Sequence, residues 1–420
     1  DSKAVATNNM YTSAFRGFGA VQACVAHEQQ MDEIAKVLGM DRLEVRRRNF
    51  LSTGDKIATG FAIESAVWSD ECMTKAWEAL GERGPDQGPV KIGRGVACYQ
   101  QSYGRITWLH DTSEAWVGVE MDGTVVVRSG VTDIGAGQIS ALCQIAAEIL
   151  GVTLDDVTIY SSDSAVTPLA GTTTATRALY MTGNAVRMAA DGVRDRLVAR
   201  AAEEFGVEPG DIDMAESKVF VADHPEQAMA FKDLVAVCAS EGIHRSELVM
   251  FKAPFTEPLD PETGQGRVHP DYVYGAHAVE VAVDTETGEV VVLKSVGAHD
   301  VGQAINPQAV AGQIEGGTAQ GQGYALSEEM LYSDGQLTTP SFSEYLIPTA
   351  MDMPKVESII LESRSGLGPF GAKGIGEPAM TAVAPAIANA VCDAIGVRIF
   401  ELPITPEKVV RALQRAEATQ

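Results

Sequence analysis

The stretch WVGVEMDGTVVVR, residues 116–128, decides the fold class of this chain. Two strand-like runs flank Asp122-Gly123, a dipeptide that favours a tight hairpin turn. A second stretch, HAVEVAVDTETGEVVVLKS at residues 277–295, repeats the pattern around Thr287-Gly288. Because helical segments accompany both hairpins, the sequence predicts an α/β chain of the mixed α+β type.

Each hairpin leads into a short loop in which a glycine follows an acidic residue. The loops are TDIGAG at residues 132–137 and HDVG at residues 299–302. Helix-like segments containing Gln144 and Gln313 follow them. The hairpin–loop–helix unit therefore occurs twice, which indicates an internal duplication.

Apolar residues at helical spacing indicate several helices. One pattern runs from Val21 to Leu38 and stops at Gly39, a residue typical of helix C-termini. Asp41 followed by Glu44 is a variant of the capping box and begins a second helix. Further helices are expected at residues 183–205, at residues 379–395 and after the N-cap Thr405. Residues 208–270 are expected to be irregular.

The length favours two or three domains, and glycine, proline and charged residues at 81–93 form the first expected linker. We expect domains at residues 1–80, 81–270 and 271–420, the first consisting of a loop and helices that complete a preceding domain. The chain starts at Asp1, close to a glycine-rich loop, so we expect more protein to precede it. A last hairpin is expected at Ser333-Asp334-Gly335.

The composition excludes several kinds of partner. With 57 acidic and 32 basic residues, the formal net charge of -25 disfavours nucleic acid and anionic membranes. Unbroken apolar runs do not approach the roughly 20 residues that a membrane span requires. We therefore expect a cytoplasmic protein.

The six cysteines lie far apart and form no C-x-x-C pair. This spacing fits neither a zinc site nor an iron–sulfur cluster, and it favours buried thiols in a reducing compartment. A metal held mainly by protein ligands is therefore not expected.

Five loops combine glycines with polar residues after strand-like runs, where backbone amides can approach a ligand. Each alone could equally be a simple turn. ATP, NAD and hydrolase motifs are missing. The loops are residues 14–19 (AFRGFG), 134–137 (IGAG), 171–177 (GTTTATR), 312–316 (GQIEG) and 371–378 (GAKGIGEP).

Three residues next to these loops leave alternatives open. Arg16 between two phenylalanines could clamp a flat ring or an anion, or could belong to a packed turn. Glu377 could be a partly desolvated general base, or a loop glutamate paired with Lys373 at the surface. His299 is expected to be a structural hydrogen-bond donor rather than a catalytic group.

In their order and spacing, these loops resemble the C-terminal part of the molybdopterin-binding subunit in the molybdenum hydroxylase (xanthine dehydrogenase/oxidase) family. The resemblance implies a multi-domain subunit with cofactor loops at a domain interface. It makes Glu377 the catalytic base, assigns Phe18 to the substrate, and leaves molybdenum to the pterin dithiolene without protein ligands. It assigns to cofactor binding Phe15, Arg16, Gly17, Gly135, Ala136, Gly137, Thr173, Thr174, Ala175, Thr176, Arg177, Gln313, Lys373 and Gly374.

One position departs from the family pattern. Ala136 stands where the family usually has glutamine, and the neighbouring Gln138 could supply the missing hydrogen bond.

The resemblance also implies an activity, cofactors and partners. The activity is hydroxylation of an aromatic N-heterocycle, purine or nicotinate-like, with water as the oxygen donor. The cofactor is molybdopterin, in the cytosine dinucleotide form, with molybdenum. Partners are a chain carrying the N-terminal half of the subunit, a [2Fe-2S] subunit and an FAD subunit.

The alternatives are an aldehyde oxidase or aryl-CoA reductase of the same family, and a non-catalytic assembly subunit. A carbon monoxide oxidising relative is disfavoured because no cysteine adjoins Arg16.

Overall fold

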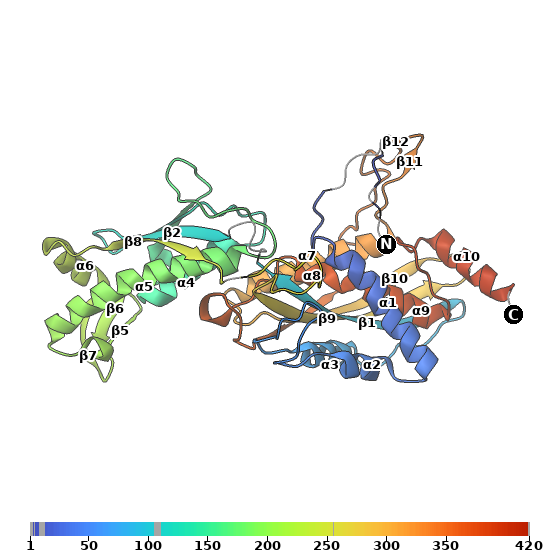
Figure 1. The fold of residues 1–420 in the computed structure, drawn as a ribbon, viewed down its shortest axis with the longest axis horizontal. Helices are drawn as coiled ribbons and strands as arrows, with labels where there is room; N and C mark the ends of the chain where they lie inside the picture. Colours follow the sequence, from blue (N-terminus) through green and yellow to red (C-terminus); the bar gives the residue numbers. More distant parts are fainter. Residues whose placement is uncertain (1–2, 4, 8–12, 105–110, 255, 419–420) are drawn as a thin grey trace.

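The computed structural model describes residues 3, 5–7, 13–104, 111–254 and 256–418. Within these residues the chain forms two lobes, each built on a four-stranded sheet (Figure 1). The sheet of the larger lobe has the order β1 (Val90–Tyr103), β9 (Asp271–Asp284), β10 (Val290–Asp300) and β13 (Val356–Leu361). The sheet of the smaller lobe has the order β8 (Ser246–Lys252), β2 (Thr112–Val119), β3 (Val125–Ser129) and β4 (Val157–Ser161).

The expected hairpin–loop–helix unit occurs in both sheets, although the outer antiparallel strand precedes the hairpin in one sheet (β1) and follows it in the other (β8). In each, two antiparallel pairings are followed by a parallel pairing. A parallel neighbour requires a crossover connection. Helix α4 (Gln138–Leu150) lies between β3 and β4, and helix α7 (Pro307–Leu326) lies between β10 and β13. Both hairpins predicted from the sequence form, with Val119 paired to Val125 and Val283 to Val290.

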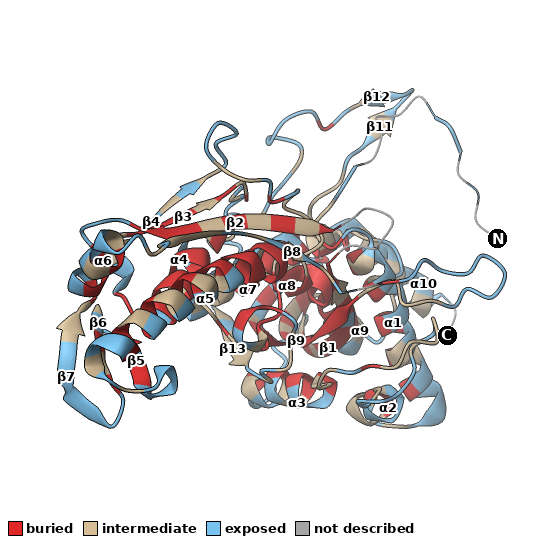
Figure 2. Ribbon diagram, turned by 60° about the vertical axis from the view of Figure 1, so that its left-hand side comes forward, coloured by how far each residue is buried: buried red, intermediate tan, exposed pale blue. Residues whose placement is uncertain are grey.

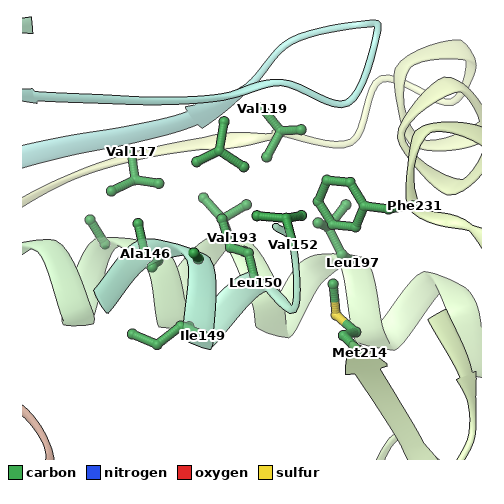
Figure 3. Close-up of a cluster of buried hydrophobic side chains, with 14 of the residues drawn as sticks. Val117, Val119, Ala146, Ile149, Leu150, Val152, Val193, Leu197, Met214 and Phe231 are labelled. Carbon is green, nitrogen blue, oxygen red and sulfur yellow. The ribbon is translucent and has the colours of Figure 1, made fainter. Parts of the chain in front are cut away.

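The core of the smaller lobe lies between its sheet and two helices, α4 and α5 (Ala178–Phe205). Figure 3 shows Val117 and Val119 of β2 facing side chains from these helices, among them Val193 and Leu197 of α5. These residues are all buried. Burial of their apolar surface stabilises the lobe, at roughly 25 cal/mol per Å² removed from water.

Residues 208–270 are more regular than the sequence predicted, and this expectation was wrong. Within the part of the chain that the structure describes, they form a three-stranded sheet and helix α6. They also include β8, the edge strand of the smaller lobe's four-stranded sheet. Strands of four residues are too short to give a clear alternation of apolar and polar residues in the sequence. In β5, Ile212 and Met214 are buried while the residues after each of them are exposed. The elements are β5 (Ile212–Ala215), β6 (Lys218–Val221), β7 (His224–Ala230) and α6 (Phe231–Ser240).

Helices cover both faces of the larger sheet. Helix α9 packs on β1, and α3 packs on β9 and β10 from the other side. The elements are α1 (Ala20–Leu38), α2 (Arg42–Asn49), α3 (Ser69–Leu80), α8 (Pro378–Thr381), α9 (Val383–Ile395) and α10 (Pro406–Glu417). Short 3₁₀ turns lie at Leu154–Asp156, Pro209–Asp211 and Pro369–Gly371.

Most helix boundaries agree with the sequence signals. The Asp41 carboxylate accepts from the amides of Leu43 and Glu44, and Thr405 Oγ1 accepts from the Lys408 amide. The helix expected at residues 379–395 is instead broken at Ala382, where the backbone leaves helical geometry. Among the described helices, the stretch Pro378–Ile395 is long and apolar enough to span a bilayer, but 78% of it is buried inside the protein.

The sheets do not divide at the residues where we expected domain boundaries. Strand β1 begins within the expected linker, at Val90, and pairs along its whole length with β9. It therefore belongs to the sheet of the C-terminal unit rather than to the range 81–270. Pairing between residues about 180 positions apart leaves no local signal in the sequence, so the three ranges remain predictions.

An arm, residues 327–355, leaves the larger lobe after α7. It contains the predicted hairpin, formed by β11 (Tyr332–Ser333) and β12 (Gln336–Leu337). Figures 1 and 2 show the arm projecting from the lobe, and most of it is coloured as exposed.

Substituting Gly95 with valine should prevent α9 from packing on β1. A Cβ atom at Gly95 would collide with the backbone atoms Ala386 O and Ala390 N of α9. Because backbone cannot yield as a side chain does, we expect a loss of about 4 kcal/mol or more of stability. Thermal unfolding should show a much lower melting temperature, whereas Gly210→Ala, where a Cβ meets no atom within 4 Å, should not. Equal melting temperatures would contradict this packing.

Candidate cofactor site

A cavity of about 520 Å³ lies where the two lobes meet, and loops from both lobes line it. The smaller lobe contributes the loop before α4 and the loop at residues 173–179. The larger lobe contributes residues 14–16, the N-terminal half of α7 and the loop at residues 373–377. The volume is in the range of sites that enclose a small-molecule cofactor.

The structure brings most of the predicted site residues together. Gly17 and Phe18 lie outside the lining that the described residues form, and Phe18 is 75% exposed. The role of Phe18 toward a substrate therefore remains a prediction. The predicted residues in the lining are Phe15, Arg16, Gly135, Ala136, Gly137, Thr173, Thr174, Ala175, Thr176, Arg177, Gln313, Lys373, Gly374 and Glu377.

Arg16 connects three separate segments at the cavity. Its Nε donates to the carbonyl of Gly376 at 2.5 Å, and its Nη2 donates to Gln313 Oε1 at 3.0 Å. Its Nη1 donates to Gln320 Oε1 at 2.9 Å. Burial lowers the pKa of Arg16, while the charge of Glu377 raises it. The planar guanidinium fixes the N-terminal loop against α7 and against the segment that carries Glu377.

Sequence reasoning did not identify Gln320. It lies seven residues after Gln313, so the two amides share one face of α7. The seven-residue spacing from Gln313 was the sequence signal that could have identified Gln320. Because the Oε1 atom of Gln313 accepts from Arg16, its amide nitrogen keeps two donors for a ligand.

The Glu377 carboxylate is held by Thr176 of the opposite lobe. Thr176 Oγ1 donates to Glu377 Oε2 at 2.8 Å and accepts from the Glu377 amide at 3.2 Å. Gly374 permits this contact, because a Cβ there would collide with Thr176. The hydroxyl therefore sets the orientation of the carboxylate at the cavity wall.

Lys373 does not pair with Glu377, and that alternative was wrong. Its ammonium donates to Asp300 Oδ2 at 2.8 Å, and both side chains are fully buried. The Lys373 amide also donates to the carbonyl of Val301 at 2.8 Å. Lys373 lines the cavity, but its charge is neutralised inside the protein, where it fixes the loop ahead of Glu377.

Arg177 has a comparable bracing role. Its Nε donates to Asp111 at 2.6 Å, and its Nη1 donates to the carbonyls of Ala170 and Thr172. These bonds hold the loop that presents Thr176.

In the loop before α4, two backbone amides bind a side chain of the protein. Asp133 Oδ1 accepts from the amides of Gly135 at 2.8 Å and Ala136 at 3.0 Å. Asp133 Oδ2 also accepts from the amide of Ile139 in the first turn of α4 at 3.5 Å, so a carboxylate of the protein lies at this helix N-terminus, a position that favours negative charge.

Gln138, the proposed substitute at the Ala136 position, lies in the cavity lining. Its Nε2 donates to the Thr132 carbonyl at 2.9 Å, and Thr173 Oγ1 donates to the same carbonyl at 2.6 Å. The buried Oε1 of Gln138 has no hydrogen-bond partner among the described residues. An orphaned acceptor on a residue that lines a cavity fits a ligand that carries N–H groups, as a pterin does.

Two histidines lie behind the site in the core of the larger lobe. His299 Nε2 is 3.2 Å from His277 Nε2, and His299 Nδ1 is 2.7 Å from the hydroxyl of Tyr99. Both rings are fully buried. Burial lowers the pKa of His277 to about 4, and burial also lowers the pKa of His299 well below its usual value. His299 therefore bonds within the core, in keeping with the expected structural role.

The residues present fit a molybdopterin cofactor held by hydrogen bonds. The amide of Gln313 offers donors, and Gln138 Oε1 offers an acceptor. Within the described ranges, no group of three or more histidine, cysteine, aspartate or glutamate residues could hold a metal ion.

Comparisons with known proteins show the family of the chain. Residues 71–354 match a family profile described as a molybdopterin cofactor-binding domain, and residues 1–50 match a second profile with the same description. The chain is 33% identical over 421 residues to the xanthine dehydrogenase molybdenum-binding subunit of Escherichia coli O157:H7, covering 97% of this chain and 54% of that protein.

Two further proteins show the same relationship. The chain is 33% identical over 420 residues to the aldehyde oxidoreductase of Megalodesulfovibrio gigas, covering 98% of this chain and 43% of that protein. The crystal structure of quinoline 2-oxidoreductase from Pseudomonas putida 86 matches with a TM-score of 0.82 and 28% identity, covering 96% of this chain and 53% of that one.

The fold and site define a molybdopterin cofactor-binding protein. The chain belongs to the xanthine dehydrogenase family of molybdenum hydroxylases. It spans about half the length of the curated relatives it matches.

The buried histidines should make the folded state sensitive to acid. Unfolded histidine has a pKa of roughly 6.5, so the unfolded chain takes up protons before folded His277 does. The stability that neutral His277 contributes is present above about pH 6.5 and is lost as the pH falls toward its folded pKa of about 4. The expected loss at pH 5 is about 2 kcal/mol.

Urea unfolding between pH 7 and pH 5 measures this effect. The His277→Gln variant should lose less stability over this interval than the wild type. His224→Gln is the control, since His224 is exposed and should leave the dependence unchanged. If His277→Gln lost as much stability between pH 7 and pH 5 as the wild type does, the result would contradict the prediction.

Proposed function

We propose that this chain provides the catalytic base and one side of the cofactor cleft in a molybdenum-dependent hydroxylase. The observation that carries the proposal is the Glu377 carboxylate, which lines the cavity while Thr176 fixes its orientation. A positioned carboxylate beside a bound cofactor suits general base catalysis. The base belongs to the larger lobe and its positioning hydroxyl to the smaller one, so the site depends on both.

The overall reaction converts a C–H bond and one water into a C–O–H group, two protons and two electrons. When bound, the molybdenum cofactor supplies the redox chemistry by accepting the two electrons. The carboxylate of Glu377 accepts a proton from the hydroxyl that derives from water. Gln313 and Gln138 orient the cofactor, and Arg16 holds Gln313 and the Glu377 segment in place.

We propose an aromatic N-heterocycle, purine or nicotinate-like, as the substrate. Support comes from the relatives named for xanthine and for quinoline, and from the exposed ring of Phe18 next to the cavity-lining Arg16. An aldehyde is the second candidate, because the aldehyde oxidoreductase of Megalodesulfovibrio gigas is equally similar in sequence.

We further propose the cytosine dinucleotide form of the cofactor, and electron transfer through a [2Fe-2S] subunit and an FAD subunit in the cytoplasm. The remaining part of the molybdenum subunit would complete the cleft. The length of the relatives supports this last point.

Substituting Glu377 with glutamine should abolish most turnover. The amide has nearly the same shape but cannot accept the proton, and a general base typically contributes 10²–10⁴-fold in rate. The measurement is kcat with purines, nicotinate and aldehydes in the complete enzyme, alongside molybdenum analysis. Unchanged turnover at equal molybdenum content would reject the catalytic role and favour the assembly alternative.

Substituting Thr176 with valine should lower kcat by about 10- to 100-fold, because a hydrogen bond to a charged group is worth roughly 1.5–3 kcal/mol. KM should change little, and Thr176→Ser should restore kcat. Thr158→Val, on the exposed side of β4, is the matched control. An effect on KM alone would show that Thr176 does not position the base.

A further inference from the structure

Helix α5 of the smaller lobe begins close to Thr176 and enters the core of the larger lobe. Its first residue, Ala178, lies two positions after Thr176. Tyr180 and Met181, in its first turn, belong to the buried apolar core of the larger lobe. The ring of Tyr180 packs edge-on against the ring of Tyr103 in β1, with centroids 5.4 Å apart. The start of α5 therefore joins the two lobes.

One turn further along, α5 holds a loop of the larger lobe. Asn184 Nδ2 donates to the carbonyl of Leu367 at 2.8 Å and, within its own helix, to the carbonyl of Tyr180 at 2.9 Å. The Leu367 amide donates to the hydroxyl of Tyr103 at 3.0 Å. Both side chains are buried, at 2% exposed for Asn184 and 0% for Tyr103. The two polar groups of the Leu367 backbone thus have buried partners, one from each lobe. We call residues 366–372 the clamp loop.

Gly183 allows α5 and the clamp loop to approach closely. A Cβ atom at Gly183 would lie 2.8 Å from Pro369 Cγ and 3.2 Å from Pro369 Cδ, and Pro369 is buried. Glycine lowers the stability of a helix interior relative to alanine. The contact with the clamp loop therefore requires a residue that the helix alone would not favour.

The backbone of the clamp loop is strained. Phe370 has a φ of 56°, and its side chain is 41% exposed, so it is not fixed by burial in a core. Gly371 has a φ of 84°, and a Cβ atom there would collide with the backbone of Arg364. Such conformations persist where the surrounding contacts hold them, and they occur preferentially at functional sites. The contacts with Gly183 and Asn184 hold this loop.

The clamp loop leads to the segment that carries Glu377. The Ala372 amide donates to the carbonyl of Pro369 at 3.0 Å, which ties the loop to the residue before Lys373. Glu377 follows four residues after Lys373, and its carboxylate accepts from Thr176 at 2.8 Å. Thr176 and Glu377 are therefore joined twice, directly by this hydrogen bond and indirectly through α5 and the clamp loop.

We propose that Gly183 and Asn184 are positioning residues for the reaction. By holding the clamp loop on α5, they fix the Glu377 carboxylate relative to the hydroxyl of Thr176, and with it the orientation of the base in the cavity. The inference rests on the proposed function, in which Glu377 accepts the proton. Among the described residues, neither Gly183 nor Asn184 belongs to the cavity lining, so both act through the clamp loop.

The test compares two glycine-to-alanine substitutions within α5 of the complete enzyme. Gly183→Ala places a methyl group against the ring of Pro369, whereas at Gly192 a Cβ atom would lie 3.4 Å from the flexible side chain of Glu247. Both substitutions raise the helix propensity to the same extent. Gly183→Ala should lower kcat per molybdenum by about 10- to 100-fold with little change in KM, because misplacing a reacting group by about 1 Å can cost about 100-fold. Gly192→Ala should change neither constant.

Hydrogen–deuterium exchange measures the attachment of the lobes without turnover. The Glu377 amide donates to Thr176 Oγ1 and the Gly104 amide donates to the carbonyl of Ala175, so both bonds join the two lobes. Peptides containing these amides should exchange faster in the Gly183 variant than in the control, while peptides of α9 exchange equally. Glu377→Gln enzyme should show the same acceleration at Gly104. Failure of the catalytic role of Glu377 is thereby separated from failure of the clamp.

Asn184→Ser is a second variant, which decides the question if Gly183→Ala does not fold. The serine hydroxyl can still donate to the carbonyl of Tyr180, four residues earlier in the helix, but it is too short to reach Leu367. This variant should therefore show both the loss of kcat and the faster exchange. Wild-type kcat and exchange, a change in either one alone, or a change in KM alone would overturn the proposal.

Discussion

The buried ion pair between Asp300 and Lys373 is the interaction on which the site depends. Two charges removed from water are costly unless other hydrogen bonds accompany their attraction. Asp300 also accepts from the amide of Gly302 at 3.0 Å, and from the amide of Ser363 at 3.1 Å and its hydroxyl at 2.9 Å. The carboxylate therefore has a donor for nearly every lone pair. This arrangement fixes the loop of Lys373 at the end of β10.

From that fixed point the rest of the site follows. The Lys373 loop leads directly to Glu377, and the end of β10 leads to α7 with Gln313 and Gln320. Arg16 then joins these two segments to the N-terminal loop. The smaller lobe repeats the crossover topology, and its own loops bring Thr176 and Gln138 to the same cavity. The repeated hairpin–loop–helix unit thus supplies two helix N-termini that meet, with Gly137 close to Ala309.

The structure also separates polar groups that serve the fold from those left for a ligand. Lys373, Arg177 and Asp133 all lie at the cavity, but their charges are paired with protein groups. The amide nitrogen of Gln313 and the Oε1 atom of Gln138 remain for hydrogen bonds to a cofactor. The family resemblance assigned Lys373 and Arg177 to the cofactor because both lie in loops that match the family pattern. The sequence could not reveal their partners, Asp300 and Asp111, since 73 and 66 positions separate them.

The sequence by itself determined what local chemistry controls. The hairpins, the caps at Asp41 and Thr405, and the glycine loops depend on neighbouring residues, and the order of the loops indicated the family. Only the tertiary structure decided the pairing of β1 with β9, the short strands at 212–230 and the partners of Lys373 and Gln320. These contacts join distant segments, and the burial that makes them favourable exists only once the chain has folded.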